Sequence, residues 1–423
     1  MDVEKNTART WLDAAATAAR EASSVLARSD AATRDAALRA AATAMRRDAE
    51  RIIAANVVDL KAFDAAGGTD AFRDRLALST PRVGAMARGL DDMAELPDPL
   101  ARTLAEWTRP NGLLIRRIAC PIGVIGMIYE SRPNVGADAA GLCLKSGNAV
   151  ILRGGSDSFH SAQAIHAAMS EGLRTAGLPP EAVQIPPQSG REYVASMLAA
   201  AGRIDLAIPR GGKNLVERVQ REARIPVLSH AIGMCHTYIH TAADPAMARA
   251  QIANAKMRRT GVCGATETLL IDAAIAPDLL PLIVTDLAAL GCAFRADARA
   301  RAISPSLPAA SPADFDTEWL DAILSIAVVD DLDGALAHIR RHGSEHTDAI
   351  VTRDPQAAAH FLAGVDSAVA LWNASTQFCD GGEFGFGAEI GIATGRVHAR
   401  GPVGVEQLTS FRYTVTGTGQ VRP

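Results

Sequence analysis

Residues 122–158 read IGVIGMIYESRPNVGADAAGLCLKSGNAVILRGGSDS. An apolar run at 122–129 is followed by a segment rich in alanine and glycine at 136–144, and by a second apolar run at 149–152. The spacing predicts a buried strand, a helix and another buried strand. Strands that alternate with helices indicate a parallel sheet with crossover helices. The stretch therefore predicts an α/β fold.

The alternation continues toward the C-terminus. A helix should reach about residue 176, where Gly177 and two prolines stop it, and a strand at 204–208 should lead to a helix that ends near 223. A second series runs from 237 to 365, with strands expected at 237–240, 266–272, 324–330 and 349–352 and helices at 245–258, 277–290 and 331–342. We therefore predict two doubly wound parallel-sheet domains.

Three regions depart from this pattern. The alanine-rich residues 5–62 have helical spacing and predict two or three helices. The stretch 303–316 is rich in Ser, Pro, Ala and Asp, so we expect a surface loop. Residues 112–118 and 405–416 suit extended strands that leave the body as a hairpin or an edge.

The composition limits the class of protein. A chain of 423 residues exceeds one ordinary core, so two or three domains are expected. With 48% hydrophobic and 21% charged residues the balance is globular, and a net charge of -4 suggests neither a nucleic-acid nor a membrane partner. We see no signal peptide and no apolar run of membrane-span length, which favours a cytoplasmic protein.

The six cysteines are scattered singly. No CxxC pair occurs, so the spacing indicates reduced thiols and argues against a zinc site. Their positions are 120, 143, 235, 263, 292 and 379.

One of these cysteines has unusual neighbours. Cys263 follows MRRTGV and precedes GATET, so two arginines and flanking glycines surround the thiol in sequence. Nearby cations lower a cysteine pKa, and glycines let a substrate carbonyl approach the backbone. Cys263 is therefore a candidate nucleophile. The alternative is a buried structural cysteine, since free cysteines are commonly buried.

Two loops could bind phosphate. Each follows an expected strand and opens a helix, where free backbone N–H groups and the helix dipole favour anions. The first holds Arg153, Gly154 and Ser156, and the second holds Gly211 and Gly212. Neither matches a GxGxxG or Walker motif, so an ordinary βα turn explains each one equally well. Together in one sheet, they point toward a dinucleotide at the carboxyl ends of the strands.

The loop chemistry bears on the choice of dinucleotide. Arg153 with Ser156 would suit the 2′-phosphate of NADP. Asp157 could instead bind a ribose hydroxyl, so NAD stays possible.

The segment after the first strand offers two further candidates. The amide of Asn134 could donate to a developing oxyanion, although an Asn that caps the following helix is an equal alternative. Arg132 could meet a phosphate or carboxylate, or could lie solvated at the surface.

At this point a resemblance becomes specific. TGVC at 260–263 resembles the nucleophile segment of the aldehyde dehydrogenase family, with Asn134 where that family has its oxyanion asparagine and Arg153 where it has a residue on the adenosine ribose. Longer segments narrow the resemblance to reductases of an acyl phosphate, and the similarity covers essentially the whole chain. These segments are YESRPNVGADAAGLCLKSGNAVILRGG (129–155), PRGGKNLV (209–216), MRRTGVCGATETLL (257–270) and the histidine-containing stretch from Val329 to Ile350.

The resemblance implies a reaction. NADPH reduces L-glutamate 5-phosphate to L-glutamate 5-semialdehyde, with release of phosphate, on the route to proline. Cys263 would form a thioester, and Asn134 with the backbone N–H of Cys263 would stabilise the oxyanion. Glu318 falls near the family's nicotinamide-ribose glutamate, although a surface acid is the simpler interpretation. Candidate substrate-binding residues are Arg132, Arg259 and Lys213.

One departure from the hydrolytic members of the family is informative. They activate the deacylating water with a glutamate, whereas the corresponding stretch here, 228–233, reads LSHAIG and has no carboxylate. His230 could act as an acid or base, or could simply pack. The spacing of His338, His342 and His346 could suggest metal ligands, but packing and capping explain it better, and the resembled family uses no metal.

The resemblance also implies a division of the chain. We expect an NADP(H)-binding domain from 1–104, 119–231 and 367–403, a catalytic domain from 232–366, and an oligomerisation arm from 105–118 and 404–423. Because an exposed hairpin is marginal by itself, the arm should add to a partner's sheet in a homodimer or homotetramer.

Two rival functions remain. The first is an NAD-dependent hydrolytic aldehyde dehydrogenase. The absence of a glutamate near His230 argues against it. The second is a catalytically silent protein that binds nucleotide or serves as a scaffold. The presence of both Cys263 and Asn134 argues against it.

Overall fold

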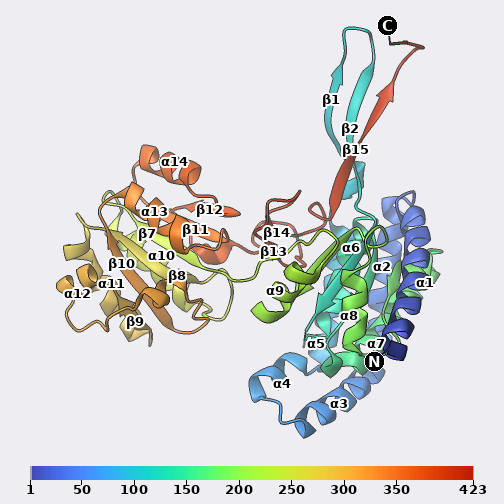
Figure 1. Cartoon of the computed structure of the whole chain (residues 1–423), viewed down its shortest axis with the longest axis horizontal. Coiled ribbons are helices and arrows are strands. Elements are labelled where there is room, and N and C mark those ends of the chain that lie inside the picture. Colours follow the sequence, from blue (N-terminus) through green and yellow to red (C-terminus); the bar gives the residue numbers. More distant parts are fainter. Residues whose placement is uncertain (1, 131, 423) are drawn as a thin grey trace. The chain divides into compact units, whose positions relative to one another are not determined.

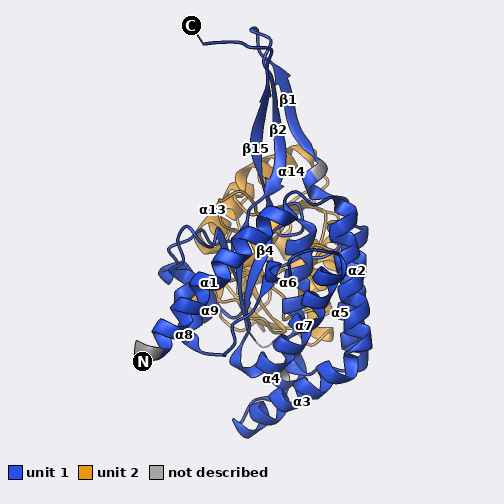
Figure 2. Cartoon of the chain, turned by 90° about the vertical axis from the view of Figure 1, so that its right-hand side faces the viewer, with its two compact units in different colours: residues 1–229, 385–391, 403–423 blue, residues 230–384, 392–402 orange. Residues whose placement is uncertain are grey.

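The computed structural model describes residues 2–130 and 132–422. The chain divides into two compact units (Figure 2). Unit 1 comprises residues 1–229, 385–391 and 403–423, and unit 2 comprises residues 230–384 and 392–402. The predicted α/β architecture with two parallel sheets is confirmed, since each unit is built on a sheet with parallel strands.

Unit 1 has a four-stranded parallel sheet in the order β5-β4-β3-β6. Side chains of β3 alternate between its two faces, as the period of a strand requires. Val124 and Ile128 join the apolar cluster formed with α1, α8 and α9, whereas Tyr129 faces Gly136 of α6. The strands are β3 (Val124–Tyr129), β4 (Ala149–Arg153), β5 (Val183–Gln184) and β6 (Leu206–Arg210).

Helices surround this sheet (Figure 1). Two of them begin at a side-chain cap: Asp30 accepts from the backbone N–H of Thr33, and Ser79 accepts from that of Arg82. The helices are α1 (Asp2–Leu26), α2 (Ala31–Arg47), α3 (Ala49–Ala65), α4 (Asp70–Leu76), α5 (Thr80–Glu95), α6 (Asn134–Lys145), α7 (Phe159–Thr175), α8 (Arg191–Leu198) and α9 (Lys213–Glu222).

Three further strands of unit 1 form an antiparallel sheet of their own, which we call the arm. They are β1 (Thr103–Thr108), β2 (Leu114–Pro121) and β15 (Thr409–Thr416), and β2 lies between the other two. Figure 2 shows the arm standing out from the helices of unit 1. The predicted extended strands near 112–118 and 405–416 are thus confirmed.

Unit 2 has a six-stranded parallel sheet in the order β12-β11-β7-β8-β10-β9. Leu269 and Ile271 of β8 pack with α10, α11 and α12, and Leu270 between them packs with α13 and α14 on the other face. The strands are β7 (Cys235–Ile239), β8 (Thr266–Asp272), β9 (Ala293–Ala296), β10 (Ile323–Val329), β11 (Thr347–Val351) and β12 (Val369–Trp372); β13 (Ile392–Ala393) and β14 (Gly401–Pro402) pair separately. The helices are α10 (Pro245–Met257), α11 (Ala276–Ala289), α12 (Ala298–Ile303), α13 (Leu332–His342) and α14 (Pro355–Gly364).

The structure divides the chain differently from our expectation after residue 366. We placed 367–403 with the cofactor domain, but 367–384 and 392–402 belong to unit 2. The reason is that β12 continues the sheet of unit 2 by pairing with β11. The expected boundary between 231 and 232 lies between 229 and 230, and the arm is counted within unit 1.

Some elements did not emerge from the sequence. The strands β5, β9 and β12 are two to four residues long, too short for a clear periodicity. The helices α4, α5, α8, α12 and α14 were also missed. Over the described residues, none of the helices combines the length and apolar character required to cross a membrane.

Candidate active site

The Cys263 loop joins α10 to β8 in unit 2, and it is held from behind by β7 and the segment before it. Cys235 Sγ donates a hydrogen bond to the backbone oxygen of Cys263 at 3.1 Å. A Cβ atom on Gly233 would lie 2.3 Å from that same oxygen, so only glycine fits there. The position of the Cys263 backbone is therefore fixed by its neighbours.

Gln377 holds the start of the same loop. Its side-chain nitrogen donates to the backbone oxygens of Ala255 and Arg259 at 3.0 and 3.1 Å. Its side-chain oxygen accepts from Arg258 Nη1 at 3.2 Å. Gln377 is buried and lies in the short helix Thr376–Phe378, and sequence reasoning did not identify it. The backbone oxygen of Arg259 is thus bound by Gln377, whereas its side chain is exposed and stays a candidate for substrate binding.

The six cysteines, all of which the structure describes, have no disulfide partners. Cys263 and Cys120 are half-buried, and the other four are buried. Burial raises the pKa of Cys292 to about 11 and also raises those of Cys143 and Cys235. Because the thiolate is the reactive form, these buried thiols are poor nucleophiles.

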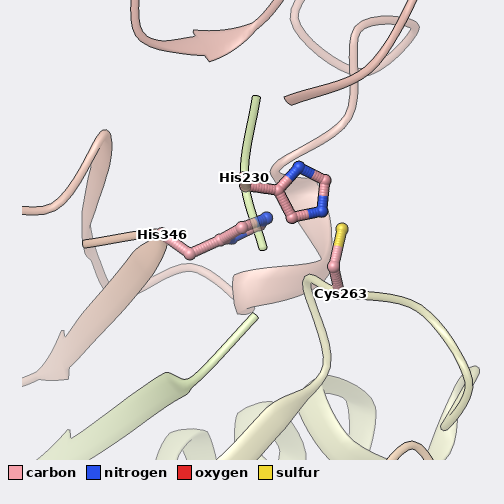
Figure 3. A group of neighbouring side chains, drawn as sticks. All are labelled: His230, Cys263 and His346. Carbon is pink, nitrogen blue, oxygen red and sulfur yellow. The ribbon is translucent and has the colours of Figure 1, made fainter. Parts of the chain in front are cut away.

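Two histidines lie beside Cys263 (Figure 3). One donor atom from each of His230, Cys263 and His346 lies within 4.8 Å of the others. The two imidazole rings are 5.2 Å apart between centroids, with planes at 73°. His230 Nδ1 donates to the backbone oxygen of Ile392 at 2.8 Å, which leaves Nε2 as its other ring nitrogen. We call these three residues the Cys–His cluster.

His346 is completely buried. Its Nδ1 lies 2.9 Å from Thr347 Oγ1 and 3.5 Å from Cys235 Sγ. Its Nε2 is buried and finds no hydrogen-bond partner among the residues that the structure describes. Burial, with a smaller contribution from His230, lowers the pKa of His346 to about 3, so the ring is neutral at physiological pH.

Of the three histidines that the sequence grouped by spacing, His338 and His342 stay together, with ring centroids 4.6 Å apart, and only His346 lies elsewhere. His338 packs against Phe315 and His236, and His342 pairs with Asp316 at 2.7 Å. His346 alone joins Cys263.

Glu318 is linked to the Cys263 loop through Gly233. Its Oε1 accepts from the backbone N–H of Gly233 at 2.8 Å, and Gly233 abuts Cys263. The structure thus places the expected ribose-binding acid in unit 2 and beside the candidate nucleophile.

A buried ion pair lies at the start of β8. Lys256 Nζ contacts Glu267 Oε2 at 2.6 Å, and both side chains are at most 1% exposed. The other oxygen of Glu267 accepts from the backbone N–H of Leu320 at 3.2 Å. Burial raises the pKa of Glu267, and Lys256 opposes that shift. The pair connects α10, β8 and the segment of Glu318 to one another.

In unit 1, Asn134 is the first residue of α6. Its Nδ2 donates to Asp138 Oδ2 at 3.0 Å, one turn further along the helix. Desolvation raises the pKa of Asp138 to about 6, although the bond from Asn134 and the charge of Arg210 both lower it. Asp138 therefore orients the Asn134 amide.

Arg153 lies at the end of β4, but its side chain turns to the protein backbone. It is 8% exposed, and Nη2 donates to the carbonyl oxygens of Ser189 and Gly190 at 2.7 and 3.1 Å. A small hollow opens beside it, lined by Gly154, Pro186 and Ser189 among others. Sequence reasoning had no signal for the segment 185–189.

The second candidate loop already carries a carboxylate. Glu130 Oε2 accepts from the backbone N–H of Gly212 at 3.1 Å, at the start of α9. A Cβ atom on Gly211 would lie 2.4 Å from that oxygen, so a larger residue there would displace the Glu130 side chain. Lys213 is exposed and lies 3.7 Å from Glu217, and Arg132 is also exposed.

The loops of unit 1 that carry the predicted residues follow adjacent strands. Asn134 and Gly211 come after β3 and β6, and Arg153 is the last residue of β4; because these strands are parallel, their carboxyl ends lie at one edge of the sheet. In unit 2, the structure brings together Cys263 and Glu318, and adds His230 and His346.

Comparisons with known proteins agree with this geometry. A sequence model described as "Aldehyde dehydrogenase family" matches residues 2–305. A gamma-glutamyl phosphate reductase from Acidiphilium cryptum is 69% identical over 423 residues, which is 100% of each chain. The crystal structure of gamma-glutamyl phosphate reductase from Thermotoga maritima is 39% identical, with a TM-score of 0.95 over 97% of this chain and 100% of that one.

A more distant structure shares the fold alone. An engineered glycolyl-CoA reductase with bound NADP+ is 16% identical, with a TM-score of 0.65 over 96% of each chain. The narrower resemblance inferred from the sequence is confirmed by the two nearer relatives. The chain therefore belongs to the aldehyde dehydrogenase family of oxidoreductases, and within it to the gamma-glutamyl phosphate reductases.

Proposed function

We propose that this chain reduces L-glutamate 5-phosphate to L-glutamate 5-semialdehyde, with release of phosphate and with NADPH as reductant, in proline biosynthesis. The observation that carries the proposal is a half-buried Cys263 whose backbone is fixed and whose neighbours are histidines, in a chain 69% identical to a relative of that name. The place of the water-activating glutamate of hydrolytic relatives is taken by the segment of His230.

Cys263 is the nucleophile in this proposal. Its thiolate attacks the acyl carbon, the bond from that carbon to the phosphate oxygen breaks, and phosphate leaves with the electron pair to give a thioester. His230, whose donor atom lies within 4.8 Å of the sulfur, receives the thiol proton. A cysteine beside an imidazole is a common form of activated nucleophile.

Asn134 is the proposed oxyanion donor, together with the backbone N–H of Cys263. Asp138 accepts from the Asn134 amide and so holds the group in one orientation before the reaction. A pre-oriented donor stabilises the tetrahedral intermediate without reorganisation.

As a member of this family the chain uses a nicotinamide cofactor, which supplies the hydride that reduces the thioester. The carboxyl edge of the unit 1 sheet suits a dinucleotide, with a hollow lined by Gly154, Pro186 and Ser189 for its adenosine portion. Arg153 would support the hollow through its bonds to 189 and 190, with Ser156 nearby. Gly211 and Gly212 would contact the phosphates of the cofactor, and Glu318 would contact its nicotinamide ribose.

Preference for NADP over NAD is part of the proposal and rests on Ser156 together with the positive charge of Arg153, whose guanidinium itself donates to backbone oxygens. Comparing kcat/KM for NADPH and NADH in a Ser156→Asp variant tests it. We expect the preference to shift toward NADH, because a carboxylate repels a 2′-phosphate. Arg132, Arg259 and Lys213 remain the proposed contacts for the charged groups of the substrate.

Self-association through the arm is also proposed, as a homodimer or homotetramer in the cytoplasm. Trp107, Phe411 and Tyr413 are 39%, 48% and 56% exposed, and they contact one another in the arm. Exposed aromatic side chains on a narrow sheet favour a partner surface. Sedimentation of a Trp107→Glu/Tyr413→Glu variant should show a smaller species than the parent protein.

The decisive experiment runs the reaction in reverse. The purified protein receives glutamate semialdehyde and NADP+, with and without phosphate, beside Cys263→Ala and the buried control Cys292→Ala. We expect phosphate-dependent NADPH formation that falls by at least ~10³-fold in Cys263→Ala and persists in Cys292→Ala. Formation of NADPH without phosphate would instead establish hydrolytic oxidation, and absence of turnover in both conditions would refute the proposed enzyme.

A further inference from the structure

We propose that the Cys–His cluster is a zinc-binding site, and that zinc bound by Cys263, His230 and His346 reversibly blocks the enzyme. The inhibition rests on the proposed role of Cys263 as nucleophile, whereas the binding of metal does not. Within the described residues, no other group of three His, Cys, Asp or Glu side chains has its donor atoms in such an arrangement.

The distances come near to those of a metal centre. The sulfur and two ring nitrogens lie within 4.8 Å of one another. A tetrahedral zinc ion with its usual bond lengths separates sulfur and nitrogen ligands by about 3.3–3.6 Å. The remaining approach of up to about 1.2–1.5 Å requires side-chain rotation of Cys263 and of the imidazoles, without movement of the backbone that Gly233 and Cys235 fix.

Both imidazoles have a partner on the nitrogen that would face away from the metal. His230 Nδ1 donates to Ile392 O. His346 Nδ1 lies against Thr347 Oγ1 and Cys235 Sγ, and the Cys235 thiol hydrogen is directed to Cys263 O, so that sulfur can accept. Zinc-bound histidines in proteins almost always have such a second hydrogen bond, which orients the ring.

His346 supplies an independent sign of a missing ligand. Its side chain is fully buried, and its Nε2 is without a hydrogen-bond partner in the described part of the chain. A buried polar atom left in this way costs free energy, about 1–3 kcal/mol in typical cases. Figure 3 shows the nitrogen-bearing side of this ring directed toward His230. A metal ion would use the lone pair that the protein leaves unused.

The donor set selects the metal. One thiolate and two imidazoles suit zinc, whereas magnesium and calcium prefer oxygen ligands. On binding, the Cys263 thiol loses its proton to solvent as the sulfur–zinc bond forms, so no oxidation or reduction takes place. Three protein ligands leave the fourth position to water. The sulfur lone pair that would attack the substrate is then bound to zinc. A chelator that removes the zinc makes the thiolate available again.

The test uses cobalt as a spectroscopic substitute for zinc in the full-length protein, after treatment with EDTA. Cobalt bound to a thiolate gives a near-ultraviolet charge-transfer band, and four-coordinate cobalt gives visible bands. We expect both to appear with one equivalent of Co²⁺ and to vanish when Zn²⁺ displaces it. Cobalt affinity should fall by at least ~100-fold in His346→Gln and in the half-buried His230→Gln, since each variant lacks a metal ligand.

Matched controls are Cys292→Ala, a buried thiol, and His360→Gln, an exposed imidazole of unit 2. Both should bind cobalt as the parent protein does. Unchanged affinity in either His346→Gln or His230→Gln would overturn the site and reduce it to an adduct of Cys263 alone. Lack of any charge-transfer band in the parent protein would also overturn it, even with reductase activity intact.

Enzyme activity provides a second readout. Zn²⁺ should inhibit the parent enzyme, EDTA should reverse the inhibition, and His346→Gln should require at least ~100-fold more zinc. If the cobalt bands appear as expected but no reductase activity exists, the proposed function fails and the metal site stands.

Discussion

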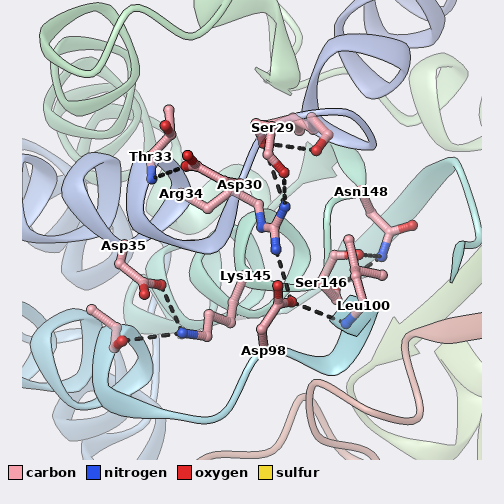
Figure 4. Close-up of polar contacts among 12 residues, drawn as sticks. Ser29, Asp30, Thr33, Arg34, Asp35, Asp98, Leu100, Lys145, Ser146 and Asn148 are labelled. Atoms are coloured by element: carbon pink, nitrogen blue, oxygen red, sulfur yellow. Dashed lines mark hydrogen bonds and ion pairs between the residues drawn. The ribbon is translucent and has the colours of Figure 1, made fainter. Parts of the chain in front are cut away.

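A buried polar network in unit 1 and the Cys–His cluster in unit 2 differ in what they hold, although each leaves one buried nitrogen, Arg34 Nε and His346 Nε2, without a partner among the described residues. In unit 1, Arg34 donates to Ser29 and to Asp98, and Lys145 donates to Asp35 and to the backbone of Ala94 (Figure 4). These bonds join α2, α6 and the segment after α5. In unit 2, the Cys–His cluster leaves His346 Nε2 without a partner among the described residues and Cys263 half-exposed. The first network holds helices together, and the second keeps atoms ready for a ligand.

The two buried lysines make the comparison quantitative. Lys145 meets Asp35, which is 16% exposed, whereas Lys256 meets Glu267, which is 1% exposed. Water reaches the carboxylate of the unit 1 pair more easily. The difference teaches that similar ion pairs carry different penalties when one partner is removed, because the penalty depends on how buried the remaining charge is.

The largest expected effect tests this difference between the two ion pairs directly. Lys256→Met leaves the Glu267 carboxyl buried without its cation and should destabilise unit 2 by about 3–5 kcal/mol. Lys145→Met should cost unit 1 less, since Asp35 can be hydrated. Hydrogen exchange followed by mass spectrometry, read on peptides from each unit, measures both variants.

The pH dependence of Lys256→Met provides its internal check. Burial already raises the folded-state pKa of Glu267, and loss of the lysine raises it further. The folded state then binds the proton more tightly than the unfolded state, so stability is lost as pH rises above the unfolded value near 4.5. A larger loss at pH 6 than at pH 8 would contradict the argument.

A smaller effect, on the rate of the reaction, is expected at the Cys263 loop. Gly233→Ala adds a Cβ atom 2.3 Å from the oxygen of Cys263, so the loop must shift. A displacement of about 1 Å at a reacting group costs roughly 10²-fold in rate, and we expect that loss in kcat/KM. Gly395→Ala, with no heavy atom within 4 Å of its added Cβ apart from its chain neighbours, is the control. Equal activity of the two variants would show that the loop is not fixed through Gly233.

The smallest effect concerns Asp138, whose pKa is raised to about 6 from 3.8. The folded state holds the proton more tightly than the unfolded state in that window, so stability should fall as pH rises from about 4 to about 6. Because Asp138 is partly exposed, we expect a loss of about 1–2 kcal/mol. Urea unfolding over this range should show it in the parent protein. In Asp138→Asn the slope should flatten, and an unchanged slope would assign the effect to another group.

Most long elements were predictable because hydrophobic periodicity is a local property, although the 16-residue α5 was missed. The strand expected at 266–272 is β8 at those same residues, and the helix expected at 245–258 is α10, which ends one residue earlier. The two-residue β5 and the four-residue β12 form only because a neighbouring strand pairs with them. Their existence depends on tertiary contacts, which single-sequence patterns do not contain.

The candidate site shows the same division. Cys263, Asn134 and Arg153 were singled out from local motifs and family resemblance. His346 was interpreted as a packing residue, because its proximity to Cys263 depends on the pairing of β7 with β8 and with β11. Gln377 and Asp138 escaped notice for a similar reason, since a buried amide and a helical aspartate carry no signature until their partners are known.

The arm also sets an order of events during synthesis. Strand β2 pairs with β15 from Pro121 opposite Thr409 to Leu114 opposite Thr416, and all of unit 2 lies between these partners in the chain. At about 5–20 residues per second, the ribosome takes roughly 15–60 s to travel from one partner to the other. All of unit 2 has been translated before the last strand of unit 1 exists. One edge of β2 therefore stays unpaired while residues 122–408 are translated, and the proposed assembly through the arm can begin only after β15 has been made.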